Sequence, residues 1–220
     1  MTQLGDLAER LERVRQQITD AGGPRVEVLA VTKGHPIAFI EAALEVGLTA
    51  IGENYAQELV AKLEGAPFDV AVHFIGQLQT NKVRRIVDLV DVYETLDRPT
   101  LATELAKRAP GARVLVQVNT TDDSTKGGCP PGEAESLVAF AASAGLTVDG
   151  LMTVGPTTGG PEAARPGFRT VRALCDTLGL ATCSMGMSDD FIVAVQEGST
   201  RVRLGSVLFG MRPAQTPRVR

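Results

Sequence analysis

Lys33 is the residue whose type and position first indicate chemistry in this sequence. It ends the apolar stretch 26–32 and is followed by Gly34 and Pro36, which favour a loop. A near-continuous, β-branched apolar run is typical of a strand buried on both faces. A lysine at its end either reaches from the rim into water or lies in a partly desolvated pocket. In a pocket its pKa would fall below the free value of ~10.4, and the neutral amine could form a Schiff base with an aldehyde.

Ser188, Gly205 and Ser206 favour the binding of a phosphate group. Ser188 precedes a segment that we predict to be helical from Asp189, where backbone N–H groups would face an anion. Gly205 and Ser206 follow a predicted strand and offer a close backbone approach and a hydroxyl. Each feature alone has a plainer explanation, since Ser188 could simply cap a helix and Gly205 could simply make a turn. The carboxylates of Asp189 and Asp190 would repel phosphate unless they turn away.

Arg203 lies two residues before Gly205, so both share one face of the predicted strand. If that face points inward, Arg203 lies below the phosphate site and near Lys33. A phosphate site, a Schiff-base lysine and a buried cation are what pyridoxal 5′-phosphate (PLP) requires. Guanidinium only donates hydrogen bonds, so beside the pyridine nitrogen it would keep that nitrogen unprotonated and the ring a weak electron sink. Alternatively, Arg203 could be an ion-pair partner of Asp or Glu in the floor of a barrel that such strands form.

A repeated strand–loop–helix pattern would bring these residues together. We predict eight strands, at 26–32, 49–52, 70–75, 91–95, 113–119, 148–154, 180–184 and 201–204. Helical segments should follow them at 37–46, 55–63, 81–89, 100–108, 133–144, 168–178, 190–197 and 207–209. Crossover helices return the chain in one direction, which makes the sheet parallel. The number of units and the chain length favour an α/β fold, a (β/α)₈ TIM barrel, over an open doubly wound sheet.

The barrel would form one domain over residues 1–220, with an extra helix at 1–21 and a flexible tail at 213–220. Its functional face should be the C-terminal ends of the strands, where polar and small residues gather, while the strand interiors stay apolar. No G-x-G-x-x-G sequence follows the first strand, which weakens a dinucleotide-binding interpretation.

Composition narrows the classes of partner. The net charge is −4 and there is no basic block, which argues against nucleic acid. No apolar run approaches the ~20 residues of a membrane span, and the polar start is unlike a signal peptide, so we expect a cytoplasmic protein. The three cysteines are odd in number, which indicates free thiols in a reducing compartment. With two histidines and no cysteine pair at ligand spacing, we expect no metal site.

Six sequence blocks carry a family resemblance in order along almost the whole chain: LAVTKGHP (29–36), IGENYAQE (51–58), HFIGQLQTNK (73–82), GLMTVGP (150–156), SMGMSDDF (184–191) and EGSTRVRLGSVLFG (197–210). At these blocks the sequence resembles the pyridoxal phosphate homeostasis protein family, cytoplasmic proteins related to the N-terminal barrel of alanine racemase. The resemblance implies one barrel that carries PLP as a lysine aldimine and no robust catalysis. It also implies a role in buffering and delivering this vitamin B6 aldehyde.

Residue by residue, the resemblance implies eight cofactor-binding positions and no catalytic or metal-binding residue. Lys33 would carry the aldimine, Ser188, Gly205 and Ser206 the phosphate, and Arg203 would face the pyridine nitrogen, while Asn54, His73 and Met152 would line the cofactor. Position 206 is often threonine in this motif, and serine keeps the hydroxyl.

Plainer roles remain for three polar residues. Asn54 could instead cap the helix that follows it, and His73 could be a hydrogen-bonded strand residue rather than an acid–base group. Lys126, in the glycine- and proline-rich loop 120–131, could be a second aldehyde site or a solvated loop lysine.

Three functions share these features. A non-catalytic PLP carrier would bind the cofactor, have PLP-dependent apoenzymes as recipients and act as a monomer. An amino-acid racemase would need a second base, which alanine racemase takes from a separate β domain; this chain ends at Arg220, and neither Tyr55 nor Tyr93 is an obvious opposed base. A Schiff-base aldolase acting on a phosphorylated sugar would share the lysine and the phosphate site. We expect the carrier rather than an enzyme.

Overall fold

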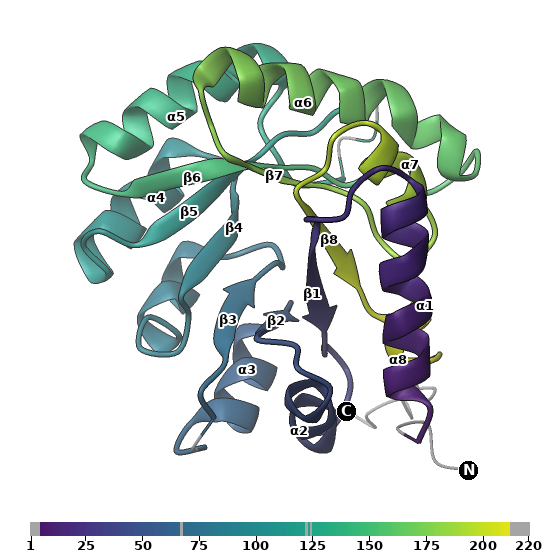
Figure 1. The fold of residues 1–220 in the computed structure, drawn as a ribbon. Coiled ribbons are helices and arrows are strands. Elements are labelled where there is room, and N and C mark those ends of the chain that lie inside the picture. Colours follow the sequence, from purple (N-terminus) through teal and green to yellow (C-terminus); the bar gives the residue numbers. More distant parts are fainter. Residues whose placement is uncertain (1–4, 67, 122, 124, 212–220) are drawn as a thin grey trace.

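Eight parallel strands close into a barrel in sequence order, as β8 pairs with β1 in the computed structural model (Figure 1). The structure describes residues 5–66, 68–121, 123 and 125–211, so the tail predicted at 213–220 lies outside the described residues. The strands are β1 (Glu27–Val31), β2 (Ala50–Glu53), β3 (Ala71–Phe74), β4 (Val92–Leu96), β5 (Arg113–Gln117), β6 (Thr147–Met152), β7 (Thr182–Ser184) and β8 (Arg201–Leu204). The predicted (β/α)₈ TIM barrel is confirmed.

The helices surround the barrel (Figure 1). They are α1 (Leu7–Asp20), α2 (Ala38–Glu45), α3 (Ala56–Leu63), α4 (Pro99–Arg108), α5 (Ala134–Ser143), α6 (Arg165–Leu178), α7 (Phe191–Gln196) and α8 (Ser206–Phe209), with 3₁₀ turns η1 (Thr80–Arg85), η2 (Pro131–Glu133) and η3 (Pro161–Ala164). Most of the apolar core lies between strands and helices, because alternate strand residues such as Val72, Val114 and Val202 point outward onto the helices. No described helix is long and apolar enough to span a membrane.

The inside of the barrel is partly polar. Inward positions of several strands carry buried polar side chains, among them His73, Glu94, Ser184 and Arg203. A small apolar cluster of Val92, Leu115 and Met152 lies apart from the two larger cores. His73, Ser184 and Arg203 belong to the polar residues predicted at the strand ends, whereas Glu94 lies in the middle of β4, where the sequence predicted an apolar residue. One polar residue hardly changes the hydropathy of a short strand, and the pleat turns it toward the inside of the barrel.

The extra N-terminal helix is confirmed as α1. Its buried residues Leu7, Leu11, Val14 and Ile18 recur every three or four positions and join one core with residues of α2, α7 and α8. α1 therefore covers the side of the barrel where β8 meets β1 (Figure 1).

The helix predicted at 81–89 is instead the 3₁₀ turn η1. Buried Val83 and Ile86 and the half-buried Leu89 are spaced by three, and i to i+3 hydrogen bonds link these residues. Because a 3₁₀ turn places residues three apart on one side, this spacing suits η1 better than an α-helix.

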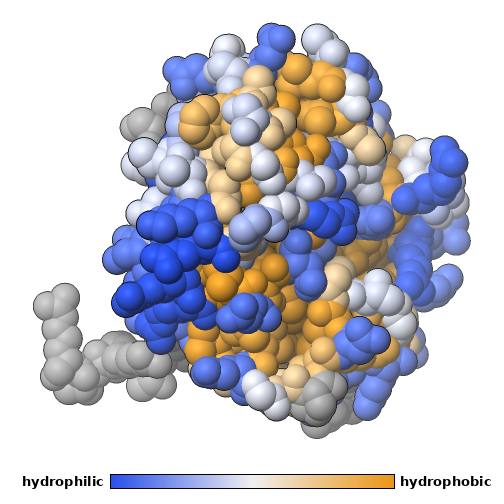
Figure 2. All heavy atoms as spheres, turned by 90° about the vertical axis from the view of Figure 1, so that its left-hand side faces the viewer, coloured by the Kyte–Doolittle hydropathy of each residue, from blue (hydrophilic) through white to orange (hydrophobic). Residues whose placement is uncertain are grey.

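Figure 2 shows the side of the molecule that carries α4 and α5, where hydrophobic patches are exposed between hydrophilic ones. Among the described residues, five large hydrophobic side chains are exposed: Ile37, Tyr55, Phe140, Met187 and Met211. Phe140 lies in α5, and the other four lie in segments that follow β1, β2, β7 and β8. Four of these five exposed side chains therefore lie on the C-terminal side of the barrel.

Candidate functional site

A cavity of about 520 Å³ opens at the C-terminal ends of the strands. Its size is within the usual range of small-molecule sites, roughly 300–1,000 Å³. Six of the eight predicted cofactor residues line it: Lys33, Asn54, Ser188, Arg203, Gly205 and Ser206. They come from segments that are separated by up to 173 positions in the sequence, yet they adjoin one cavity because β1, β2, β7 and β8 are neighbours in the closed sheet.

Lys33 follows β1 at the cavity wall, within a tight turn. The His35 N–H donates to the Thr32 carbonyl oxygen at 3.1 Å, and Gly34 between them has φ = 73°. The His35 ring also lines the cavity and stacks on Phe39 with the ring centroids 4.3 Å apart. The turn therefore places Lys33 at the edge of a partly apolar pocket. A partly desolvated pocket is the environment in which we expected a reactive amine.

Ser188 joins the two loops that were predicted to bind phosphate. Its Oγ accepts the backbone N–H groups of Gly205 and Val207, each at 3.3 Å. These donors converge on one hydroxyl of the cavity wall, and an anionic oxygen that took the place of this hydroxyl would accept both N–H groups. The Val207 N–H was missed by sequence reasoning, since a backbone donor has no residue-type signal.

The acidic pair after Ser188 is arranged unequally. Helix α7 begins at Phe191 rather than Asp189, and Asp190 Oδ1 accepts the Met187 N–H at 2.6 Å. Burial raises the pKa of Asp190, which weakens its repulsion of an anion. Asp189 is exposed and lines the cavity mouth.

Arg203 lies in the floor of the cavity and is 4% exposed. Nη1 donates to the Ser184 carbonyl and hydroxyl at 2.8 and 2.9 Å, and Nη2 donates to the Thr153 carbonyl at 2.7 Å. Burial lowers the pKa of Arg203, and the carboxylates of Glu94 and Asp190 oppose this change. Three of its five N–H donors are used in these bonds, which leaves donor capacity for a ligand acceptor.

Asn54 supplies a buried acceptor to the same cavity. Its Oδ1 has no hydrogen-bond partner among the described residues, and no side chain caps α3, whose N-cap is Tyr55. An unsatisfied buried acceptor costs free energy, so the position suits a ligand that carries a donor. Helix capping, the alternative role for Asn54, is not what the structure shows.

His73 and Met152 do not line this cavity. Met152 packs against Val92 and Leu115 inside the barrel. His73 Nδ1 bonds to Glu94 Oε1 at 2.7 Å, and His73 lines a separate cavity of about 660 Å³ at the N-terminal end of the barrel. His73 is therefore a hydrogen-bonded strand residue here, which was its alternative role.

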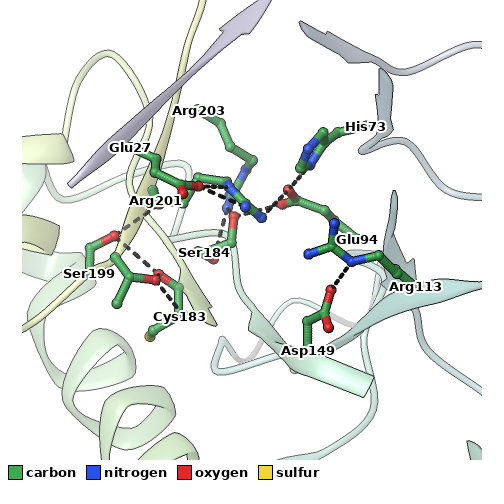
Figure 3. A network of polar contacts seen from close by, with 11 residues as sticks. Glu27, His73, Glu94, Arg113, Asp149, Cys183, Ser184, Ser199, Arg201 and Arg203 are labelled. Carbon is green, nitrogen blue, oxygen red and sulfur yellow. Dashed lines mark hydrogen bonds and ion pairs between the residues drawn. The ribbon is translucent and has the colours of Figure 1, made fainter. Parts of the chain in front are cut away.

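Glu94 links the two ends of the barrel (Figure 3). It accepts hydrogen bonds from His73, from Ser184 Oγ at 2.6 Å and from Arg201 Nη1 at 3.2 Å. Ser184 in turn accepts from Arg203 in the cavity floor. Although burial alone would raise the pKa of Glu94, the His73 hydrogen bond and the nearby positive charges lower it to about 2. The buried Glu94 carboxylate is therefore linked through Ser184 to Arg203, the cation in the cavity floor.

Several cavity residues are not among the eight predicted cofactor-binding positions: Val31, His35, Ile75, Val154, Met187, Asp189, Gly210 and Met211. Most follow the C-terminal end of a strand, the position at which the sequence predicted the functional face. Lys126 is not among the lining residues, and its Nζ donates to the Gly155 carbonyl at 2.5 Å. Cys129, Cys175 and Cys183 are free and buried, and the described residues contain no group of three His, Cys, Asp or Glu that could hold a metal ion.

Comparison with protein families defines the class first. The family model described as alanine racemase, N-terminal domain, matches residues 3–213. Alanine racemase from Clostridium difficile has the same fold, with a TM-score of 0.73 at 13% sequence identity, and the match covers 94% of this chain and 58% of that one. At this low identity the likeness concerns the fold alone.

Closer relatives identify the family within that class. Pyridoxal phosphate homeostasis proteins from Aquifex aeolicus and Schizosaccharomyces pombe are 40% and 36% identical to this chain, over 93% and 94% of it and 97% and 93% of their own lengths. PipY of Synechococcus elongatus, solved with PLP bound, superposes with a TM-score of 0.83 at 31% identity and covers 93% of this chain and 100% of its own. The chain belongs to the pyridoxal phosphate homeostasis protein family.

Proposed function

We propose that this protein holds PLP as a Schiff base on Lys33 and takes part in intracellular PLP homeostasis without robust catalysis. The observation that carries the proposal is the single cavity that Lys33 shares with the convergent N–H donors around Ser188 and with the buried Arg203. The PLP found in the related PipY structure supports the choice of ligand.

The residues present fit such a ligand. Ser188, Gly205 and Ser206 offer hydroxyl and N–H donors to a phosphate, and Asn54 Oδ1 is a buried acceptor without a partner among the described residues. Arg203 presents donors only, so it would keep a facing pyridine nitrogen unprotonated. PLP is an electron sink for amino-acid chemistry, and this arrangement would weaken that property. That His73 and Met152 line the cofactor stays a prediction, although neither belongs to the cavity lining.

The carrier role has further parts that the proposal includes. PLP-dependent apoenzymes would be the recipients of the cofactor, the protein would act in the cytoplasm, and it would be a monomer. Sedimentation velocity of the protein with and without PLP tests the last of these, because a dimer would sediment faster at every concentration above its dissociation constant.

The decisive experiment is a visible spectrum of the purified protein with PLP, before and after borohydride. We expect a band at about 420 nm that borohydride removes, with the reduced adduct mapped to Lys33. Lys33→Ala should abolish the band, whereas Lys126→Ala should keep it. A colourless complex, or an adduct at another lysine, would refute the Lys33 assignment.

A racemase would be distinguished by turnover. The PLP-loaded protein is incubated with L-alanine and with D-alanine while optical rotation is followed. We expect no sustained interconversion, since the proposed arrangement at Arg203 is poor at stabilising a carbanion. Continued change toward the racemic mixture would overturn the carrier proposal.

A further inference from the structure

The two residues that flank Lys33 are both held by polar groups outside the cavity. Thr32 Oγ1 donates to Glu53 Oε1 at 2.6 Å, at the end of β2. The Gly34 N–H donates to Glu58 Oε1 at 2.5 Å, on α3. Lys33 is therefore clamped from both sides, although neither carboxylate is among the described residues that line the cavity.

Lys62 on α3 completes the clamp. Its Nζ lies 2.8 Å from the Thr32 carbonyl oxygen, 2.8 Å from Glu53 Oε1 and 2.5 Å from Glu58 Oε1. An ammonium group has three N–H donors, and these three acceptors use all of them. The Lys62 side chain is only 9% exposed, so the amine is saturated and shielded and is no rival to Lys33 for an aldehyde.

The electrostatic balance of the clamp depends on that ammonium. Glu53 is fully buried, and burial raises its pKa, while the charge and hydrogen bond of Lys62 lower it. A buried carboxylate without a cation is costly, so Lys62 keeps Glu53 and Glu58 together beneath the turn.

The clamp fixes a particular turn geometry. The bond from the His35 N–H to the Thr32 carbonyl closes a four-residue turn with Lys33 second and Gly34 third. A φ of 73° at the third residue is the signature of a type II turn. Flipping the central peptide to type I would change ψ of Lys33 by about 150° and turn the Gly34 N–H away from its acceptor. Glu58 therefore selects the turn that presents Lys33.

We propose that Glu58 and Lys62 are positioning residues that hold the Lys33 turn, and thereby set how quickly Lys33 captures and releases PLP. The inference rests on the proposed function, because it assumes that Lys33 is the attachment point. Two polar residues of α3 would thus control the reactivity of Lys33, which lies outside that helix in the turn after β1.

The test compares wild type with Glu58→Ala, Glu58→Gln and Lys62→Met. Two controls separate positioning from general effects. Leu63→Ala removes buried contacts from the same helix without touching the clamp, and Arg108→Met breaks the i, i+4 pair with Glu104 on α4. Rate constants for PLP capture and release are followed by visible absorbance, and amide hydrogen exchange of residues 32–35 is measured without PLP.

Loss of the clamp should accelerate exchange at Gly34 and PLP release by at least about tenfold in Glu58→Ala and Lys62→Met. Glu58→Gln keeps an oxygen acceptor for the Gly34 N–H, so its exchange rate should stay near wild type. Glu58 is 22% exposed and its removal leaves the Lys62–Glu53 pair, which keeps the test valid if Lys62→Met does not fold. Leu63→Ala and Arg108→Met should leave both rates unchanged.

The failures are distinguishable. A borohydride adduct at Lys33 in wild type, with PLP rates in Glu58→Ala that equal those of wild type or of Leu63→Ala, would overturn the positioning role alone. Absence of the adduct from wild type would overturn the proposed function, and the inference with it.

Discussion

Replacing Glu94 by Gln tests whether the polar interior of the barrel depends on one buried charge. Glu94 is fully buried, and its pKa is lowered from 4.5 to about 2. Lowering this pKa from 4.5 to about 2 corresponds to about 3 kcal/mol of unfolding free energy. Gln keeps the shape and one acceptor oxygen but not the charge. We therefore expect Glu94→Gln to lose about 3 kcal/mol at pH 7, or roughly 6–12 °C in Tm for a domain of this size.

The pH dependence gives the prediction its sign. Because the folded-state pKa lies below the unfolded one, the stabilisation is fully present above about pH 4.5 and is lost as the pH falls toward 2. Urea unfolding at pH 7, 5 and 3.5 should show the gap between wild type and Glu94→Gln narrowing at the lowest pH. Glu104→Gln, in a half-exposed pair with Arg108, is the matched control and should lose at most about 1 kcal/mol. A Glu94→Gln loss below about 1 kcal/mol at pH 7, or a gap that does not change with pH, would refute this reasoning.

Three further substitutions address the cavity and the backbone next to it. Ser188→Ala removes the hydroxyl that accepts two backbone N–H groups and should weaken PLP binding about tenfold, measured by titration of the visible band. Gly76→Ala should lower the unfolding free energy by about 2–3 kcal/mol in urea, since a Cβ there would overlap the Asn54 carbonyl. Gly205→Ala should lower the unfolding free energy by less than about 1 kcal/mol, because the new Cβ would first meet the Val31 carbonyl oxygen at 3.4 Å. If this variant loses PLP affinity and keeps its stability, the ligand must approach the backbone of residue 205 closely.

The sequence predicted the barrel and its functional face because both depend on local patterns. Short apolar runs separated by amphipathic segments indicate parallel strands with crossover helices, and the predicted strand at 201–204 coincides with β8. Residues directly after such strands, among them Lys33 and Ser188, must lie at one end of a closed parallel barrel whatever the exact register. Helix α1 was equally accessible, since its apolar spacing is regular.

The polar interior and the clamp could not be predicted, because their partners are distant in the sequence. Glu94 reads as one polar position in a short strand, and its partners Ser184 and Arg201 lie 90 and 107 positions away. From the sequence alone, Lys62 resembles an ordinary lysine on a solvated helix face. Only the register of β1 with β2 shows that the Thr32 carbonyl lies beside it. A barrel closes only when the tilt and stagger of all eight strands are mutually consistent. The resulting register around the whole barrel determines which inward side chains contact one another. The residues that surround PLP are therefore predictable from position along a strand, whereas those that orient them follow from closure of the barrel.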